Sequence, residues 1–275
     1  MKKMLIVDGN SIINRAFYGI RPLTTSYGLH TNAIFGMINI LLKHLDALHP
    51  DYCAIAFDLK APTFRHKMYA DYKAGRRAMP EELAMQFEPA RECAKALGFT
   101  LLSLEGYEAD DILGTLSAEA DKEGIESYVV TGDRDSLQLI GEWTTVLLET
   151  NKGTVRFDRT HFIEEYGVTP EQFVDVKALM GDSSDNIPGV PGIGEKTALK
   201  YISQFGTLDA LYDGLESAGF TASMHSKLSA GRDSAFMSRK LATICRKVPD
   251  IPEPSSLGNG QLDRHAAREL FTRLE

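Results

Sequence analysis

The sequence has few of the features that would suggest a disulfide framework or a membrane location. Its 275 residues include only three cysteines, an odd number at no spacing typical of a metal site, so we expect reduced cysteines in a cytoplasmic protein. No apolar run approaches the ~20 residues that a transmembrane helix needs. The N-terminus, Met1-Lys2-Lys3 followed by a short apolar run, lacks the features of a signal peptide, so we expect no membrane partner.

Positive charge is also scarce, because the formal net charge is −8. Taken alone, this argues against a nucleic-acid partner, since phosphate binding requires a basic surface. Acids that bind metal ions do not act as free charge, however, so the distribution of charge matters more. Residues 60–77 include six Lys and Arg residues but only one acid, Asp71, and Phe64, Tyr69 and Tyr72 lie among them. This pattern suits single-stranded nucleic acid, although an ordinary solvated face is the more common fate of a charge run.

The apolar pattern predicts an α/β fold with a mainly parallel sheet and helices on both faces. In the first two thirds, strands expected at 4–7, 52–57, 100–104, 127–131 and 145–148 alternate with helices at 33–48, 81–97 and 108–122. After about residue 170 the pattern becomes helical, with helices expected at 171–180, 195–205, 208–215 and 233–246. A stretch rich in Pro, Ser and Gly, 249–260, is typical of a linker. We therefore expect domains at 1–170 and 171–248, followed by a linker and a terminal helix at 249–275.

Acidic residues follow three of the predicted strands: Asp8, Asp58 and Asp133. Because functional residues of an open parallel sheet gather at the carboxyl ends of its strands, we expect these three acids to lie at one edge. Further acids occur in tight groups along the chain, at Glu108, Asp110, Asp111, Asp135, Asp182 and Asp185. Any one of them alone is more often a helix cap or a turn residue. Their convergence on one edge favours a common function.

Clustered carboxylates repel one another and need cations to be tolerated. Oxygen ligands without histidine or cysteine suit a hard cation such as Mg²⁺ or Mn²⁺. Two such ions, roughly 4 Å apart, can hold the attacking and leaving oxygens of a phosphodiester. The sequence therefore predicts a metal-dependent phosphodiesterase.

A glycine-rich run, 187–198, resembles a phosphate loop only superficially. In a P-loop, lysine directly follows the last glycine, whereas here Glu195 separates Gly194 from Lys196, and a helix rather than a strand precedes the run. The better interpretation is a hairpin between two helices, with Gly189, Gly192 and Gly194 bringing backbone N–H groups to a phosphate and Lys196 adding charge. A plain tight turn is the alternative.

Taken together, these residues resemble the 5′-nuclease (flap endonuclease) domain at the N-terminus of bacterial DNA polymerase I. The matching stretches run in family order from residue 7 to about residue 200. They are Val7-Asp8-Gly9-Asn10-Ser11, Phe57-Asp58, Thr63-Phe64-Arg65-His66, Tyr72-Lys73, Gly106-Tyr107-Glu108-Ala109-Asp110-Asp111, Thr131-Gly132-Asp133-Arg134-Asp135 and the stretch 181–194.

The resemblance implies a PIN-like sheet with a helix-hairpin-helix module. It implies two or three divalent ions, Mg²⁺ or Mn²⁺, and an arch at about 60–90 through which a 5′ single strand passes. Lys73 and Arg76 match residues that contact the scissile phosphate, and Tyr72 matches one on which a base stacks. With Arg65, Arg77 and the hairpin they form the expected DNA-binding set, and a K⁺ ion often accompanies the hairpin. The metal ligands implied are Asp8, Asp58, Glu108, Asp110, Asp111, Asp133, Asp135, Asp182 and Asp185.

The expected function is therefore structure-specific 5′-3′ exonuclease and flap endonuclease activity in replication, including Okazaki primer removal, and in repair. The expected partners are 5′-flap or nicked duplex DNA and RNA-primed 5′ ends. We expect a monomer that belongs to a larger polymerase chain, with a stand-alone nuclease as the alternative. A non-catalytic branched-DNA-binding module would be favoured by a missing ligand acid, and none is missing. A PIN-type ribonuclease would need neither the hairpin nor the long arch.

Overall fold

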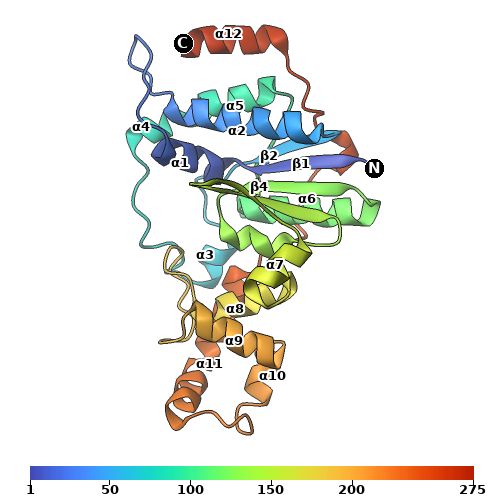
Figure 1. Ribbon diagram of the computed structural model, residues 1–275. Coiled ribbons are helices and arrows are strands. Elements are labelled where there is room, and N and C mark those ends of the chain that lie inside the picture. Colours follow the sequence, from blue (N-terminus) through green and yellow to red (C-terminus); the bar gives the residue numbers. More distant parts are fainter.

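The computed structural model describes residues 1–275 and contains a six-stranded sheet of order β3-β2-β1-β4-β5-β6 (Figure 1). Five strands are parallel, as the sequence predicted: β1 (Lys3–Asp8), β2 (Tyr52–Ala56), β3 (Thr100–Leu102), β4 (Glu126–Thr131) and β5 (Thr144–Thr150). The sixth, β6 (Gly153–Phe157), pairs antiparallel with β5 and was not predicted. It is a short edge strand with only one buried residue, Phe157, so its apolar pattern is weak.

Helices cover both faces of the sheet, because alternate residues of each strand point in opposite directions. In β1, Leu5 and Val7 belong to a core cluster with residues of α1 (Gly9–Gly19), α2 (Asn32–Leu48) and α5 (Phe87–Ala96). Met4 and Ile6 belong to the opposite cluster, which includes one face of α6 (Ala109–Glu123). Helix α1, directly after Asp8, was not predicted. The helix predicted at 81–97 is in fact α4 (Glu81–Ala84) and α5, separated at Met85 and Gln86.

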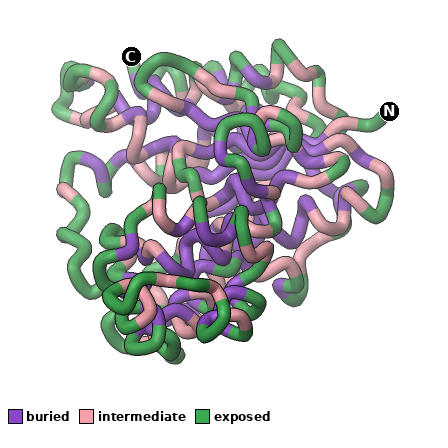
Figure 2. Tube along the Cα trace, turned by 60° about the horizontal axis from the view of Figure 1, so that its bottom comes forward, coloured by how far each residue is buried: buried purple, intermediate pink, exposed green.

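The helical module continues from the sheet without a break in the core (Figures 1 and 2). Its helices are α7 (Arg159–Tyr166), α8 (Phe173–Met180), α9 (Glu195–Phe205), α10 (Leu208–Asp213) and α11 (Ala222–Ala242). One buried cluster contains Val129 of the sheet together with Phe162, Leu179, Ile202 and Leu228 of the module. Helix α11 begins eleven residues before the predicted start, because its first half is largely polar and exposed. No helix has both the length and the apolar composition needed to cross a membrane.

Residues 249–260 are packed against the sheet, which corrects the expectation of a linker, whereas the helix expected at 263–275 is present. The N–H of Cys53 donates to the carbonyl of Gly258 at 2.5 Å, and the N–H of Gly258 donates to the hydroxyl of Thr100 at 2.7 Å. Helix α12 (Arg264–Leu274) then lies along α5 and buries Ala267 and Leu274 (Figure 1). Proline, serine and glycine mark irregular backbone, which here follows the sheet edge.

Two short helices lie close to the site. Helix α3 (Phe64–Met68) follows β2, and a 3₁₀ helix, η1 (Arg134–Leu139), follows β4. The segment between α3 and α4, residues 69–80, has no regular secondary structure and crosses in front of the carboxyl ends of the strands (Figure 1). We call residues 58–80 the arch segment.

Candidate metal centre

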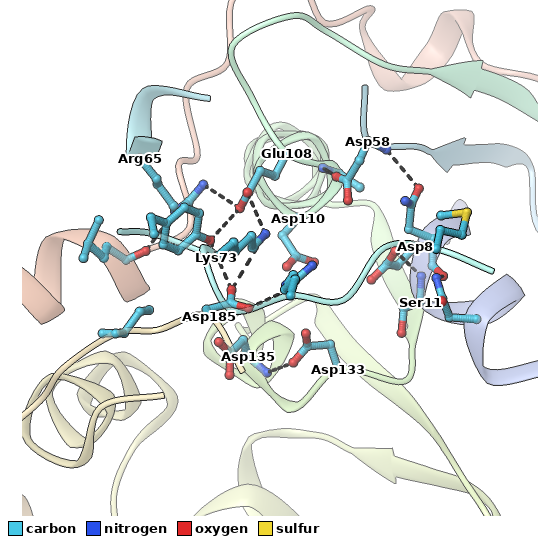
Figure 3. Close-up of a pocket in the computed structure, with 18 of the residues that line it drawn as sticks. Asp8, Ser11, Asp58, Arg65, Lys73, Glu108, Asp110, Asp133, Asp135 and Asp185 are labelled. Carbon is cyan, nitrogen blue, oxygen red and sulfur yellow. Dashed lines mark hydrogen bonds and ion pairs between the residues drawn. The ribbon is translucent and has the colours of Figure 1, made fainter. Parts of the chain in front are cut away.

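The carboxyl ends of β1, β2 and β4 lead into one cavity of about 560 Å³. The acids predicted at one edge of the sheet are brought together there, and Figure 3 shows their side chains around a common space. Acids from the start of α6, from η1 and from the loop after α8 join those that follow the strands. Seven carboxylates line the cavity: Asp8, Asp58, Glu108, Asp110, Asp133, Asp135 and Asp185.

Backbone capping fixes several of these carboxylates. Asp8 is the N-cap of α1 and accepts a hydrogen bond from the N–H of Ser11 at 2.9 Å. Asp58 accepts from the N–H of Ala109 at 2.8 Å, and Asp133 caps η1 by accepting from the N–H of Asp135 at 2.9 Å. The same residues therefore act as caps and line the cavity. The second oxygen of Asp58 and of Asp133 stays free, whereas that of Asp8 accepts from the Thr131 hydroxyl at 3.1 Å.

Burial and mutual repulsion shift these acids toward their neutral forms. Burial first, and then Asp58 and Asp133, raise the pKa of Asp8 to about 7. Burial and four neighbouring carboxylates raise the pKa of Asp110 well above its usual value. Burial and Asp133 raise the pKa of Asp135 to about 6, although Lys177 opposes this shift. A donor set of this kind fits hard divalent cations, which would stabilise the ionised carboxylates.

The carboxylates face a shared space rather than a single point. No group of three or more His, Cys, Asp or Glu side chains is arranged here so that it could hold one ion. Ion binding therefore requires some side-chain rotation, and the assignment of individual acids to ions stays a proposal.

Two basic residues of the arch segment contact the cavity acids. The ammonium of Lys73 lies 2.6 Å from Glu108 Oε1 and 3.7 Å from Asp185 Oδ2. The guanidinium of Arg76 forms an ion pair with Asp185. Lys73 has a positive φ of 58°, and its N–H donates to the carbonyl of Asp185. The exposed Arg77 lines the same cavity. The structure thus places Lys73 beside Glu108 and Asp185 (Figure 3), and it pairs Arg76, the other member of the expected catalytic pair, with Asp185.

Sequence reasoning missed Lys177 of α8. Its ammonium lies 2.5 Å from Asp135 Oδ1 and 2.8 Å from Asp182 Oδ2. Burial would raise the pKa of Asp182, but the hydrogen bonds from Lys177 and Ser184, together with the charge of Lys177, outweigh it and lower this pKa to about 2. Asp182 does not line the cavity. Lys177 lies on a mostly apolar helix, so only the position of that helix relative to the sheet could have revealed its role.

Asp111 and Arg65 form a buried pair, which corrects two expectations. Asp111 is fully buried outside the cavity, and its oxygens accept from Arg65 and from the N–H groups of Glu108 and Cys245. All five N–H groups of Arg65 are used: they donate to Asp111 twice, to Glu108, and to the carbonyls of Leu241 and Thr243. Neither residue is free to bind an ion or a DNA phosphate. They lock α3 and the end of α11 to the start of α6.

Tyr72 is also buried, with an exposed fraction of 3%. Its hydroxyl lies within hydrogen-bond distance of Glu108 Oε2, at 3.0 Å, and of Asp185 Oδ2, at 3.1 Å. Its ring packs edge-on against His66, with the centroids 5.2 Å apart. A base cannot stack on a ring enclosed in this way. Tyr72 instead positions two carboxylates, so the expectation that it stacks a base is wrong for this structure.

The hairpin between α8 and α9 divides into a buried and an exposed part. Gly189 is buried, its N–H donates to Ser238 Oγ at 2.9 Å, and a Cβ there would lie 2.3 Å from the nitrogen of Gly181. This glycine permits close packing of two backbones and does not face a ligand. Gly192, Gly194 and Lys196 are exposed at the start of α9. Only these three of the four predicted hairpin residues can approach a phosphate.

Comparisons with known proteins agree with this architecture. Residues 3–167 match the family described as 5′-3′ exonuclease, N-terminal resolvase-like domain, and residues 168–264 match 5′-3′ exonuclease, C-terminal SAM fold. The DNA polymerases I of Bacillus subtilis and Caldicellulosiruptor bescii are 44% and 40% identical to this chain over 99% of its length. The chain spans about a third of the length of these polymerases, 31% and 32%.

Solved structures show the same fold. The T5 D15 protein co-crystallised with metal ions matches with a TM-score of 0.73 at 21% identity, over 100% of both chains. The catalytic core of Rad2 in complex with DNA substrate matches with a TM-score of 0.66 at 16% identity, over 99% of this chain and 88% of that one. Both family matches together cover nearly the whole sequence in the expected order. The chain belongs to the 5′-3′ exonuclease family.

Proposed function

We propose that this chain is a divalent-metal-dependent, structure-specific 5′-3′ exonuclease and flap endonuclease that hydrolyses DNA phosphodiesters near 5′ ends. The observation that carries the proposal is the single cavity in which seven carboxylates from five separate segments meet Lys73 and Arg76 of the arch segment. Among the solved structures with this fold, the T5 D15 flap endonuclease was crystallised in a pseudo-enzyme-product complex with DNA and metal ions. The non-catalytic alternative is not favoured, because no cavity acid is missing.

The proposed ligands are the seven carboxylates of the cavity. Two acids expected from the sequence are left out of this ligand set. Asp182 lies outside the cavity and pairs with Lys177, and Asp111 is buried against Arg65. Two or three Mg²⁺ or Mn²⁺ ions bound here would activate water and stabilise the attacking and leaving oxygens of the phosphodiester. Buried acids such as Asp8 and Asp110 must give up their protons when ions bind, because only the carboxylate is a ligand.

The cations of the arch segment complete the proposed chemistry. Lys73 and Arg76 hold positive charge over the cavity, where it can stabilise negative charge that develops on the reacting phosphate. Their present partners, Glu108 and Asp185, would be shared with the metal ions, so these contacts must loosen when ions and DNA enter. Tyr72 and Arg65 keep the Glu108 carboxylate in place from behind.

The exposed part of the hairpin is the proposed contact with duplex DNA. The first turn of α9 presents free backbone N–H groups beside Gly192, Gly194 and Lys196, which suits a phosphate of any sequence. A K⁺ ion at this turn is part of the same proposal. The proposed substrates are 5′-flap and nicked duplexes and RNA-primed 5′ ends, in replication and repair.

The deciding experiment uses a duplex with a labelled 5′ flap, incubated with Mg²⁺ or with EDTA, followed by mapping of the product. We expect a cut at the junction only with Mg²⁺, and no cut by the Asp110→Asn variant. A labelled single-stranded RNA in parallel tests the ribonuclease alternative. Binding of the flap without any cut in Mg²⁺ would leave only a DNA-binding module.

A further inference from the structure

Tyr18 is an exposed aromatic residue in the wall of the carboxylate cavity. The side chains of only two aromatic residues line this cavity, Tyr18 and Tyr72, and they differ completely in accessibility. Tyr72 is 3% exposed, whereas Tyr18 is 72% exposed. A single exposed aromatic residue on a protein surface is ordinary. This one shares its cavity with seven carboxylates and four Lys and Arg residues, and it offers there an uncovered flat apolar face.

The position of Tyr18 follows from the geometry of α1. Ser11, Asn14 and Tyr18 all line the cavity, at spacings of three and four residues, so one face of α1 forms this wall. Asp8 caps the start of that face and Tyr18 lies near its end. Tyr18 comes seven positions after Ser11, which corresponds to a rise of about 10 Å along the helix. This is roughly the length of three stacked nucleotides at 3.4 Å each.

The surroundings of Tyr18 suit a nucleotide better than another protein. Phe17 supports the ring edge-on, with centroids 5.0 Å apart and planes at 84°, so the ring is braced without being covered. Arg77, Ala78 and Met79 of the arch segment line the same cavity, and Arg77 offers a free cation for a phosphate. An aromatic face beside a cation is the usual combination for holding an unpaired base and its phosphate.

We propose that Tyr18 is the base-stacking platform of this nuclease, and that it holds a nucleobase within about three nucleotides of the scissile phosphate. The inference rests on the proposed function, because the base reaches Tyr18 only if its strand enters the cavity. Tyr18 is thus a positioning residue: it touches the DNA, and it sets which phosphate lies over the carboxylates. This assigns to α1 the role that the sequence had suggested for Tyr72.

The test combines protein variants with substrates that lack one base. Tyr18→Ala, Tyr18→Phe and Phe35→Ala are compared; Phe35 is an exposed aromatic residue of α2 outside the cavity and serves as the matched control. Each protein cuts an intact 5′-flap duplex in Mg²⁺ and a series of duplexes with one abasic site at successive positions on either side of the scissile phosphate. Thermal unfolding confirms that every variant is folded.

On the intact flap we expect Tyr18→Ala to raise KM about tenfold and to spread the cut over neighbouring phosphates, while Tyr18→Phe and Phe35→Ala behave like the wild type. At one abasic position the KM of the wild type should rise to that of Tyr18→Ala on the intact flap, whereas the KM of Tyr18→Ala should rise no further. Equal behaviour of Tyr18→Ala and Phe35→Ala overturns the proposal. So does a Tyr18→Ala defect that is the same at every abasic position.

A binding measurement in EDTA separates this proposal from the proposed function. A 2-aminopurine, placed in turn at each position on either side of the junction, reports stacking through loss of fluorescence and needs no cutting. We expect quenching with the wild type and with Tyr18→Phe, and none with Tyr18→Ala. If the wild type does not cut in Mg²⁺, the proposed function fails, while the quenching still decides whether Tyr18 stacks a base.

Discussion

Asp8 lies among other acids at the end of β1, and its pKa is raised from 3.8 to about 7. A carboxyl group with a raised pKa binds its proton more tightly in the folded state than in the unfolded state, so the free energy of unfolding falls as pH rises from about 4 to about 7. Asp8→Asn removes this titration. In EDTA, we expect the variant to be more stable than the wild type at pH 7, and the difference to disappear near pH 4. Urea denaturation across this range measures it.

The same variant should not cut DNA in Mg²⁺, because a ligand is lost, while its affinity for duplex stays close to normal. Asp46→Asn, at an exposed position of α2, is the control for both measurements. A constant difference in stability between Asp8→Asn and the wild type at pH 4 and pH 7 would show that the raised pKa of Asp8 is not its cause.

Arg65 and Asp111 make the opposite case, in which a charged pair supports the fold. Both are buried, and removing one partner of a buried pair leaves the other charge uncompensated, which typically costs about 3–5 kcal/mol. We expect Arg65→Met to lower the free energy of unfolding by about this amount. Arg77→Met, at an exposed site without an ion pair, should change it by less than about 0.5 kcal/mol. Denaturant titration of both variants decides whether Arg65 is structural.

Affinity for DNA should change in the reverse order. Arg77→Met should weaken flap binding, and at low temperature the folded fraction of Arg65→Met should bind nearly as well as the wild type. A strong loss of binding by well-folded Arg65→Met would restore the original expectation that Arg65 contacts DNA.

Neighbouring residues show which details of the site the sequence could predict. The strand-end acids could be placed together because parallel strands bring their carboxyl ends to one edge. Asp110 and Asp111 could not be distinguished, because successive residues on a helix point about 100° apart and the rotation of α6 was unknown. Asp110 faces the cavity, whereas Asp111 faces Arg65. For the same reason, the burial of Tyr72 and the approach of Lys177 became visible only in three dimensions.

At the scale of elements, the arch segment lines two neighbouring cavities. The second, of about 360 Å³, lies against Lys60, Pro62 and His66, and it shares Asp58, Lys73, Arg76 and Glu108 with the first. Two adjoining cavities along one segment suit a single strand that passes beneath it. The residues that anchor the segment are also cations of the site, so its position and the chemistry are coupled.

We expect Lys73→Ala to lower the rate of flap cleavage by about 10²-fold or more, with a smaller effect on binding, because its charge acts on the reacting phosphate. Lys67→Ala, at an exposed position of α3 outside both cavities, is the matched control. Attaching a bulky group to the free 5′ end before mixing should inhibit cutting if the strand threads. Equal rates on blocked and free flaps would argue against passage beneath the arch segment.

The hairpin glycines allow a sharper prediction than the sequence alone supported. Gly192 has a φ of +81° and lies next to Lys227, whereas Gly194 has an ordinary φ of −98° and open space around its Cα. Gly192→Val should therefore weaken duplex binding by distorting the turn, because a β-branched residue disfavours positive φ. Gly194→Ala should have little effect on the fold. Affinity for blunt duplex, measured by anisotropy in EDTA, distinguishes a binding turn from a plain one.

Strand and helix boundaries were predictable where the apolar period was clear and failed where it was not. The buried parallel strands and α2 were found because their apolar residues are dense and regular. Helix α1 was missed because polar residues that face the cavity interrupt its apolar stripe. The break between α4 and α5 depends on Gln86, whose side-chain oxygen accepts from the N–H of Ala33 at the start of α2. Such a contact between distant segments leaves no local signal.

At the scale of the whole molecule, the chain returns from the helical module to the sheet domain. The core cluster that begins under the sheet continues through α8 and α11, so the sheet and the helical module share one hydrophobic core. Residues 243–248 then lead back to α6, where Val248 donates to Thr115 and Cys245 to Asp111. These contacts connect the helical module, and with it the hairpin, to the helix that begins at the cavity. The proposed cut at a duplex junction requires such a connection, because the hairpin would bind the duplex while the cavity holds the scissile phosphate.

The final segment, residues 249–275, packs against the sheet and α5. Its removal should lower the free energy of unfolding without removing any proposed ligand. Truncation after residue 262 deletes α12, whose Ala267 and Leu274 are buried on α5. Truncation after residue 248 also removes Leu257 and two hydrogen bonds of Gly258, whose carbonyl accepts from Cys53 of β2 and whose N–H donates to the Thr100 hydroxyl of β3. Each buried leucine contributes about 1.5–3 kcal/mol, so we expect two successive decreases in the free energy of unfolding.

Both truncated chains should still cut 5′ flaps at low temperature, where they stay folded, because every proposed ligand precedes residue 186. Flap cleavage and urea denaturation of the same preparations separate stability from chemistry. If the shorter chain kept full stability, residues 249–260 would be the linker that the sequence suggested, since a linker leaves no buried surface behind. If the shorter chain were folded but inactive, the final segment would have to shape the cavity through α6, which the short 3₁₀ helix Pro254–Ser256 contacts.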